Sequence, residues 1–217
     1  MTPYSNVPTA RRSFLARLGA AAAAFGVSAM PKSARANTSH DVRIDDDPWM
    51  QRLTASGPLR VVFHSHEATN GTALTWGRTF LETQKNSYGK TDKDCGVVIG
   101  LNGKAIGLVF NDAMWAKYPI AQTMGMTGTK NPAGPTGSDQ IAQLVARGGI
   151  ILVCNNSLRA SGQRFLPEDK RGDAAARTAF AEEARVNLLP GMDVVPAMVV
   201  ALQQAQDRGC RYVYAGG

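Results

Sequence analysis

The fold is decided by a stretch near the C-terminus, residues 192–214, which reads MDVVPAMVVALQQAQDRGCRYVY. Residues 192–195, which follow a Pro190-Gly191 turn, predict a strand. Pro196 suits the first turn of a helix, and Gly209 is typical of a helix end. The run Cys210–Tyr214 predicts a second strand. A strand, a helix and a strand in this order indicate two parallel strands joined by a crossover helix.

The same alternation extends towards the N-terminus. The apolar run Ile150–Cys154 has the continuous hydrophobicity of a strand that is buried on both faces. Leu59–Ser65 and Cys95–Leu101 predict two further strands. Helices are predicted at residues 72–85, at 105–118, after a capping Ser138, and at 173–188. Strands alternating with helices predict an α/β domain in which helices cover both faces of a parallel sheet.

The formal charge of the chain is +7, but the charge is concentrated at one end. Residues 1–36 contain five basic side chains and no acidic one, which leaves 19 basic and 17 acidic residues in the rest. A body so close to neutral gains little from releasing counterions from a phosphate backbone. We therefore expect no nucleic-acid partner.

The first 36 residues are typical of an export signal. Arg11-Arg12-Ser13-Phe14-Leu15 resembles the twin-arginine (Tat) motif, and an apolar stretch of 13 residues follows at 18–30. That stretch is shorter than the ~20 residues that span a bilayer. Ala34-Arg35-Ala36 then supplies a small-x-small cleavage site. We expect a Tat signal peptide at 1–36 and a periplasmic protein that begins near Asn37, the alternative being an uncleaved anchoring helix.

The mature chain is expected to have one domain. Residues 37–57 look like a polar lead-in, and regular structure is expected over residues 58–217. No later stretch has 18 uninterrupted apolar residues, so no membrane span is expected after cleavage of the signal.

Two stretches resemble the DsrE/DsrF-like superfamily of small α/β proteins. In residues 189–214, a Gly-x-x-x-Val-Pro turn precedes a helix, a glycine and an aromatic strand. In residues 147–158, Cys154 stands at the end of a strand. The resemblance implies a three-layer, flavodoxin-like, mostly parallel sheet of about five strands, usually assembled into homo-oligomers. Some members are sulfurtransferase subunits that carry persulfide on a cysteine, and Cys154 is the position that carries over.

Cys154 is therefore the candidate sulfur carrier, acting with a sulfur donor or acceptor protein. Ligands of open α/β sheets bind beyond the carboxyl ends of the strands, where Cys154 falls. A helix starting at Asn156 or Ser157 would lower the pKa of the thiol, and Asn155 completes this part of the binding rim. The alternative is that Cys154 is a small buried hydrophobic residue.

His64 and His66 end the first predicted strand, two residues apart and so on one side of an extended chain. Neutral imidazoles suit zinc or copper, and Cys154 would complete a set of three ligands. The two histidines could instead act as acid, base or orienting partners of Cys154. A polar rim without chemistry is the third alternative.

Asn70 and Asn102 follow the first and second strands, each with a glycine after it. These loops would lie at the same edge of the sheet and could bind a small anion. They lack the full glycine pattern and the Lys-Ser/Thr pair of a phosphate-binding loop, so no nucleotide cofactor is expected.

Cys95 and Cys210 each begin a predicted strand, at the opposite end of the sheet from Cys154. In a flavodoxin-like order the second and last strands lie at opposite edges. We therefore expect no intrachain disulfide, because the Cα atoms would need to lie within about 7 Å.

Three functions remain open. The first is an exported DsrE-like protein that handles thiol or persulfide sulfur at Cys154. The second is a non-catalytic oligomeric binding module of the same fold, with the helical stripe at residues 176–188 as a contact surface. The third is a periplasmic metal-binding protein centred on His64, His66 and Cys154.

Overall fold

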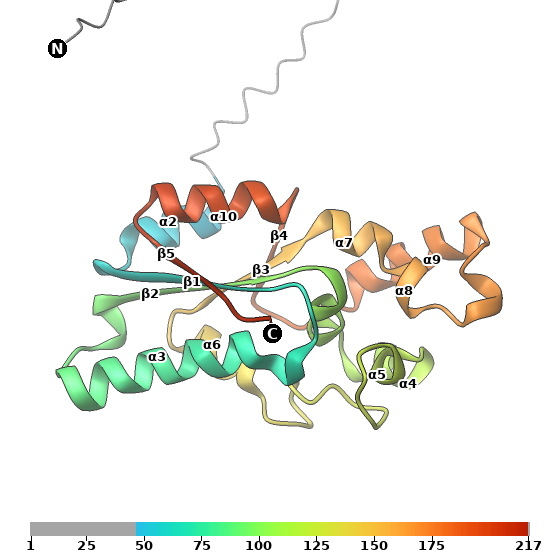
Figure 1. The fold of residues 1–217 in the computed structure, drawn as a ribbon, viewed down its shortest axis with the longest axis horizontal. Coiled ribbons are helices and arrows are strands. Elements are labelled where there is room, and N and C mark those ends of the chain that lie inside the picture. Colours follow the sequence, from blue (N-terminus) through green and yellow to red (C-terminus); the bar gives the residue numbers. More distant parts are fainter. Residues whose placement is uncertain (1–46, 217) are drawn as a thin grey trace, which may run out of the picture. The chain divides into compact units, whose positions relative to one another are not determined.

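The computed structural model describes residues 47–216. Its centre is a sheet of five parallel strands in the order β4-β3-β2-β1-β5 (Figure 1). The strands are β1 (Leu59–Ser65), β2 (Cys95–Leu101), β3 (Ile150–Cys154), β4 (Met192–Val195) and β5 (Arg211–Tyr214). The sequence prediction of all five strands is confirmed.

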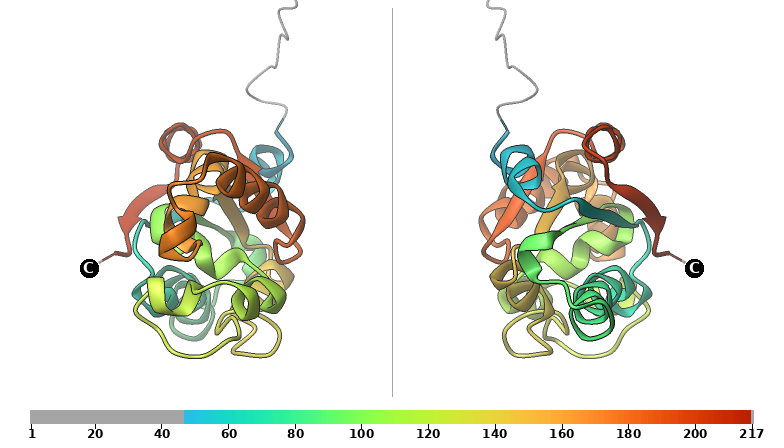
Figure 2. Two further views of the ribbon diagram at one scale, coloured as in Figure 1. Left: turned by 90° about the vertical axis from the view of Figure 1, so that its right-hand side faces the viewer. Right: turned by 90° about the vertical axis from the view of Figure 1, so that its left-hand side faces the viewer.

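Helices cover both faces of the sheet, so the fold has three layers (Figure 2). One face carries α2 (Pro48–Ala55) and α10 (Met198–Asp207), and the other carries α3 (Thr72–Tyr88) and α6 (Gln140–Ala146). The prediction of a three-layer, flavodoxin-like α/β fold is confirmed.

Most of the other helices gather beyond the carboxyl ends of the strands (Figure 1). They are η2 (Thr69–Gly71), η4 (Gly103–Val109), α4 (Asp112–Lys117), α5 (Ile120–Thr123), α7 (Asn155–Ala160), α8 (Gly162–Phe165), η5 (Glu168–Lys170) and α9 (Ala174–Val186). At the other end of the sheet, η3 (Asp92–Asp94) leads into β2.

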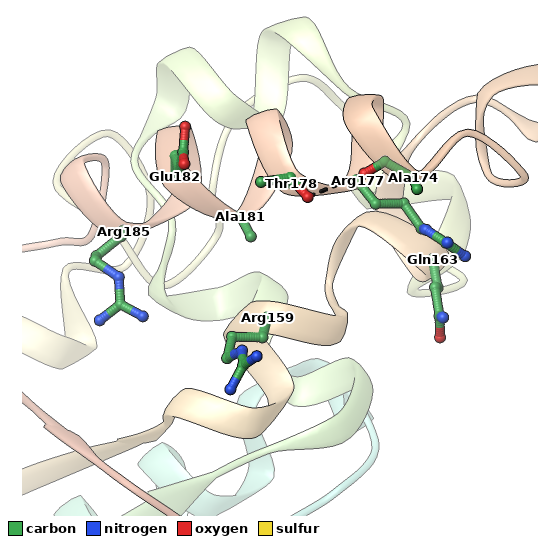
Figure 3. Close-up of a pocket in the computed structure, with 8 residues that line it drawn as sticks. All are labelled: Arg159, Gln163, Ala174, Arg177, Thr178, Ala181, Glu182 and Arg185. Atoms are coloured by element: carbon green, nitrogen blue, oxygen red, sulfur yellow. Dashed lines mark hydrogen bonds between the residues drawn. The ribbon is translucent and has the colours of Figure 1, made fainter.

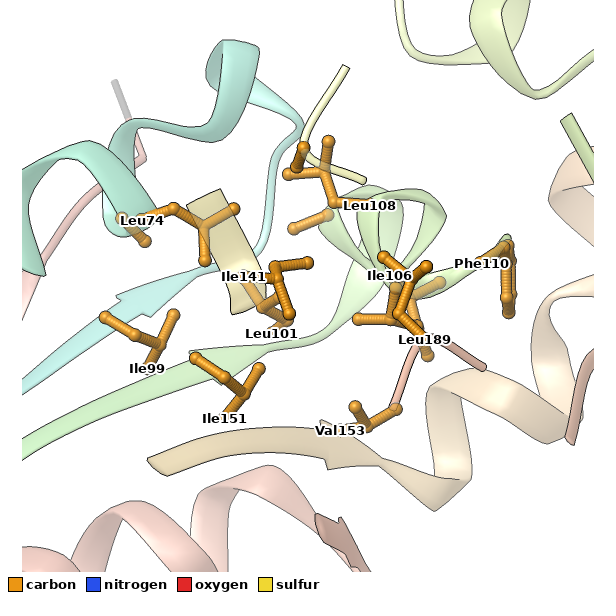
Figure 4. Close-up of a cluster of buried hydrophobic side chains, with 14 of the residues drawn as sticks. Leu74, Ile99, Leu101, Ile106, Leu108, Phe110, Ile141, Ile151, Val153 and Leu189 are labelled. Carbon is orange, nitrogen blue, oxygen red and sulfur yellow. The ribbon is translucent and has the colours of Figure 1, made fainter. Parts of the chain in front are cut away.

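The core lies on both sides of the sheet because the side chains of each strand alternate between the two faces. Towards α3 and α6, Ile99, Leu101, Ile151 and Val153 pack against Leu74 and Ile141 (Figure 4). Towards α2 and α10, a second buried cluster includes Val62, Val98, Leu152, Cys154 and Met198. Every residue of β2 is buried, which agrees with its central place.

The predicted helix at 105–118 is wrong in its first half. Residues 103–109 form the tighter 3-10 helix η4, and the α-helix α4 begins only after Asn111. The side-chain oxygen of Asn111 accepts a hydrogen bond from the backbone N–H of Met114 and so caps α4. Ser138 does not cap α6, because its hydroxyl donates to the carbonyl of Pro132.

The predicted polar lead-in at 37–57 contains a helix. Helix α2 buries Trp49, Met50 and Leu53 against the sheet, so residues from 48 on belong to the compact body. The polar residues between them face solvent. Because of these residues, the sequence predicted a polar lead-in here and no helix. The predicted signal peptide at 1–36 lies outside the described residues.

The strand order corrects the reasoning about Cys95 and Cys210. Strand β2 is central, and only β1 separates it from β5, so the two strands do not lie at opposite edges. Both cysteines and Cys154 are buried free thiols in the structure. No helix within residues 47–216 is long and apolar enough to cross a membrane.

Candidate functional site

A chain of hydrogen bonds crosses the sheet near the carboxyl ends of β1, β2 and β5. The Nδ1 atom of His64 lies 2.9 Å from the hydroxyl of Tyr212, and its Nε2 atom lies 3.0 Å from Oδ1 of Asn102. An amide oxygen can only accept, so Nε2 of His64 carries the proton. Nδ1 then accepts from the hydroxyl of Tyr212. The network fixes one tautomer of a neutral imidazole.

The pKa of His64 agrees with this neutral state. Burial lowers the pKa of the imidazole below its usual range, the hydrogen bond to Asn102 raises it, and the charge of nearby His66 lowers it again. Burial also raises the pKa of Tyr212, which keeps its hydroxyl protonated. Every proton of the network therefore stays in place near neutral pH.

Two tyrosines of the edge strand β5 surround His64. The ring of Tyr214 lies 5.7 Å from the imidazole and that of Tyr212 lies 6.0 Å from it, measured between ring centroids. Tyr214 is 48% exposed, so much of the ring remains open to solvent. This rim combines polar atoms with accessible aromatic surface.

The turn after β1 has a strained backbone. Thr69, Asn70 and Gly71 have φ values of 34°, 49° and 77°, all in the left-handed region. Glycine adopts this region freely and asparagine tolerates it, but a β-branched threonine does so at a cost of about 1–3 kcal/mol. Such strain persists only where the surroundings hold it, and it gathers at functional sites.

The strained turn is tied to the chain after β5. The hydroxyl of Thr69 donates to the carbonyl of Ala215, and the N–H of Ala215 donates to the carbonyl of His64. One turn along, the hydroxyl of Thr72 donates to the carbonyl of Thr69 at 2.6 Å. The loop after β1 and the end of the chain thus form one structural unit.

This unit borders a hollow of about 460 Å³. Six residues from η2, α3 and the end of β5 line it: Thr69, Thr72, Trp76, Tyr214, Ala215 and Gly216. None of the six carries a charged side chain. Trp76 is 42% exposed, so it and Tyr214 offer aromatic surface beside two hydroxyl oxygens.

Cys154 lies in a different setting. It is only 5% exposed and belongs to the apolar cluster under α2 and α10, with Val195 and Met198. His64 is paired with Gly100, which is paired with Leu152, so Cys154 lies two strands across and two residues further on. Strand spacing and rise put its Cα roughly 12 Å from that of His64. The structure does not bring the two side chains together.

The three residues after Cys154 have separate surroundings. Ser157 is buried, and its hydroxyl accepts a hydrogen bond of 3.1 Å from the backbone N–H of Gly103. The side-chain oxygen of Asn155 accepts a hydrogen bond from Arg185, and Asn156 is exposed. Asn155 and Ser157 thus tie α7 to α9 and to the turn after Asn102.

His66 is exposed, and its ring lies against Gly103. Its carbonyl accepts from the backbone N–H groups of Lys104 and Ala105. Within residues 47–216, no group of three or more His, Cys, Asp or Glu side chains is placed to hold a metal ion. The structure therefore does not assemble His64, His66 and Cys154 as a ligand set.

The sequence did not predict the aromatic side chains that lie near His64 and the hollow. Tyr212, Tyr214 and Trp76 carry no motif, and the strain at Thr69 is invisible in the sequence. The alternation Tyr-Val-Tyr was a usable signal, because residues two apart on a strand share a face. It would have placed both tyrosines on one side of the last strand.

Comparison with known proteins adds little to this description. No protein-family model and no curated protein matches the chain. Among solved structures, the chain is similar to a protein of unknown function, MTH1491, from Methanobacterium thermoautotrophicum. The identity is 18% and the TM-score 0.42, and the match covers 72% of this chain and 98% of the other.

Proposed function

We propose that this chain is an exported, non-catalytic binding module that takes a small uncharged molecule in the hollow between the ends of β1 and β5. The observation that carries the proposal is the strained turn Thr69–Gly71, which borders that hollow. Strain of this kind costs stability and is retained where it shapes a site.

The place in the fold supports the proposal. Open α/β sheets bind ligands beyond the carboxyl ends of the strands, where the sequential order of neighbouring strands is broken. Strands β1 and β5 are the neighbours of this sheet that are not consecutive in the chain. The hollow lies beside that break.

The lining indicates the chemistry of the ligand. The half-exposed ring of Trp76 favours a flat apolar face, such as an aromatic ring or the face of a sugar. The hydroxyl protons of Thr69 and Thr72 are already donated to carbonyls, so their oxygens are left as acceptors. A ligand with a hydroxyl or N–H group fits these acceptors. The volume lies within the range of about 300–1,000 Å³ that is usual for small-molecule sites.

The state of His64 favours binding over catalysis. A general base needs a free lone pair within reach of a substrate proton. The lone pair of Nδ1 accepts from Tyr212, and the proton of Nε2 is donated to Asn102. We assign His64 the role of holding the rim together.

Ligand-observed NMR with phenol and a methyl glucoside tests the proposal. We expect saturation transfer to at least one of the two probes, and its loss in Trp76→Ala. Tyr88→Ala is the matched control, because Tyr88 is an exposed aromatic residue of the same helix outside the hollow. Equal transfer in the Trp76 and Tyr88 variants, or none to either probe in the unaltered protein, would falsify the proposed site.

Export by the Tat pathway and assembly into a homo-oligomer complete the proposal. The motif at Arg11-Arg12 and the cleavage site before Asn37 support export. Expression of the full chain is expected to yield a periplasmic protein whose mass corresponds to a start near Asn37. Replacing both arginines by lysine should keep the protein in the cytoplasm. Light scattering of the mature protein tests the oligomer, and a monomeric mass would reject it.

Sulfur handling by a DsrE-like protein is the second candidate, and one observation favours it. Cys154 immediately precedes α7 at the carboxyl end of β3, the position that the family resemblance implies. Persulfide on this thiol would add about 32 Da, the mass of one sulfur atom. Mass spectrometry after incubation with a persulfide donor, with and without reductant, tests it. His66→Cys is the exposed control thiol, and modification of the control without modification of Cys154 would reject sulfur transfer.

A further inference from the structure

Helices α7 and α9 enclose a second hollow of about 460 Å³ that carries three arginines: Arg159, Arg177 and Arg185 (Figure 3). We propose that this groove binds a small molecule with two or more anionic groups, such as phosphates, sulfates or carboxylates. The site is separate from the rim of β1 and β5, and the two share no lining residue.

The positive charge of the groove is not neutralised by the protein. Among residues 47–216, none of the three arginines has a carboxylate within ion-pair distance. Glu182 is the one acidic lining residue, and its carboxylate points away from the guanidinium groups of Arg159 and Arg185 (Figure 3). An anion from solution can therefore bind these guanidinium groups without competing with a side-chain carboxylate.

The neighbouring acids of α9 are engaged elsewhere. Glu183 accepts hydrogen bonds from Lys117 at 2.7 Å and from Tyr118 at 2.6 Å. The bond from Lys117, together with that from Tyr118, lowers the pKa of Glu183. Asp173 accepts from the first backbone N–H groups of α9 and caps that helix. Neither carboxylate is turned towards the arginines.

Helical spacing explains why two of the three arginines line the same groove. Arg177, Ala181 and Arg185 are four residues apart and so lie on one face of α9. The Cα atoms of Arg177 and Arg185 are about 12 Å apart at 1.5 Å per residue. Arg159 lies across the groove on α7, and Ala181 leaves room between them. Charges spread over this length suit an extended anion better than a single small ion.

Arginine is well suited to binding anions that carry several oxygen atoms. A guanidinium group offers planar, paired donors that match carboxylate and phosphate oxygens. Elsewhere in residues 47–216, Arg52, Arg78 and Arg147 each form an ion pair with an acidic side chain. The three arginines of the groove contrast with them. Arg185 has one neutral partner, the side-chain oxygen of Asn155, which orients it.

Isothermal titration with inorganic tripolyphosphate, at constant ionic strength set with chloride, tests the proposal on the mature protein. We expect saturable binding, and about tenfold weaker binding for each of Arg159→Gln and Arg185→Gln, the loss expected for one charge-assisted contact. Arg211→Gln is the matched control, because Arg211 is an exposed arginine on β5, outside the groove. It should bind as the unaltered protein does.

The outcomes separate the groove from general attraction by charge. Equal weakening in the Arg211 variant, or no saturable binding of tripolyphosphate, overturns the proposal. Binding of poly-glutamate without binding of tripolyphosphate also overturns it, because the site would then take an acidic polymer. Arg185→Lys keeps the charge but loses the paired donors, so binding between that of Arg185→Gln and the unaltered protein supports the assigned geometry. Circular dichroism confirms that each variant is folded.

Discussion

Strands β1 and β3 both end at the same edge of the sheet, yet the two ends are built differently. After β3, helix α7 begins at once and Cys154 is covered by apolar side chains. After β1, the chain enters a strained turn, and the neighbouring rim keeps hydrogen-bonding atoms and half-exposed aromatic rings. A side chain at the carboxyl end of a parallel strand is therefore not always accessible to a ligand. Its accessibility depends on the segment that follows the strand and on the layer that packs against it.

The largest effect is expected at Gly103, where the two regions meet. Its φ is +56°, and an added Cβ would lie 2.5 Å from the carbonyl oxygen of His66. We expect Gly103→Ala to lower the free energy of unfolding by about 3 kcal/mol or more, because backbone strain and a clash with backbone atoms add. Urea denaturation measures the change.

Gly148 provides the control for that substitution. Its φ is +84°, but an added Cβ would meet nothing within 4 Å. Gly148→Ala should cost only about 1 kcal/mol, the price of the strained conformation alone. If the two variants lose the same free energy of unfolding, the close contact between Gly103 and His66 contributes nothing, and the predicted clash is wrong.

The next effect concerns the closed region. Cys154→Ser places a hydroxyl among apolar side chains and should cost about 2 kcal/mol, reduced by about 1 kcal/mol if the serine oxygen caps α7, whose N-cap residue is Cys154. Cys154→Ala is the control and should cost about 1 kcal/mol, for the lost contacts of the sulfur. Thermal and urea unfolding of both variants give the comparison. A serine variant as stable as the alanine variant would show that the hydroxyl finds a partner, and would contradict a fully apolar setting for this side chain.

A smaller effect of opposite sign is expected in the open region. Asparagine tolerates the left-handed backbone that threonine resists, and the hydrogen bond lost from Thr69 to Ala215 is long at 3.3 Å, so Thr69→Asn should raise the free energy of unfolding by up to about 1 kcal/mol. Thr79→Asn, on an exposed helical position, should give no gain. A loss of stability in the Thr69 variant would contradict the assigned strain.

The smallest effect is a pH dependence from His64. Its folded pKa lies below the unfolded value of 6.5, so protonation favours the unfolded chain. The contribution of His64 to stability is present above pH 6.5 and is lost as the pH falls from there through the folded pKa. Urea unfolding at pH 7.5 and at pH 5.5 should show less pH dependence in His64→Gln than in the unaltered protein. His66→Gln, at an exposed position, should keep most of it.

The sequence is informative about the central strands β2 and β3 because each is a short apolar run, and every residue of both is buried. It fails where partners are distant in the chain. His64 and Tyr212 are separated by 148 residues, and no local pattern pairs them. Cys154 was predicted at a strand end, but its burial depends on α10 and on α2, a helix within what looks like a polar lead-in. The strained turn could not be predicted either, because the sequence does not give the backbone angle φ of a threonine.

The hydrogen bond from the N–H of Gly103 to the hydroxyl of Ser157 ties the first turn of α7 to the turn after β2. The His66 ring rests against Gly103, so a movement of α7 that breaks this bond also changes the surroundings of the His66 imidazole. The chemical shift of that imidazole is therefore a probe of the position of α7.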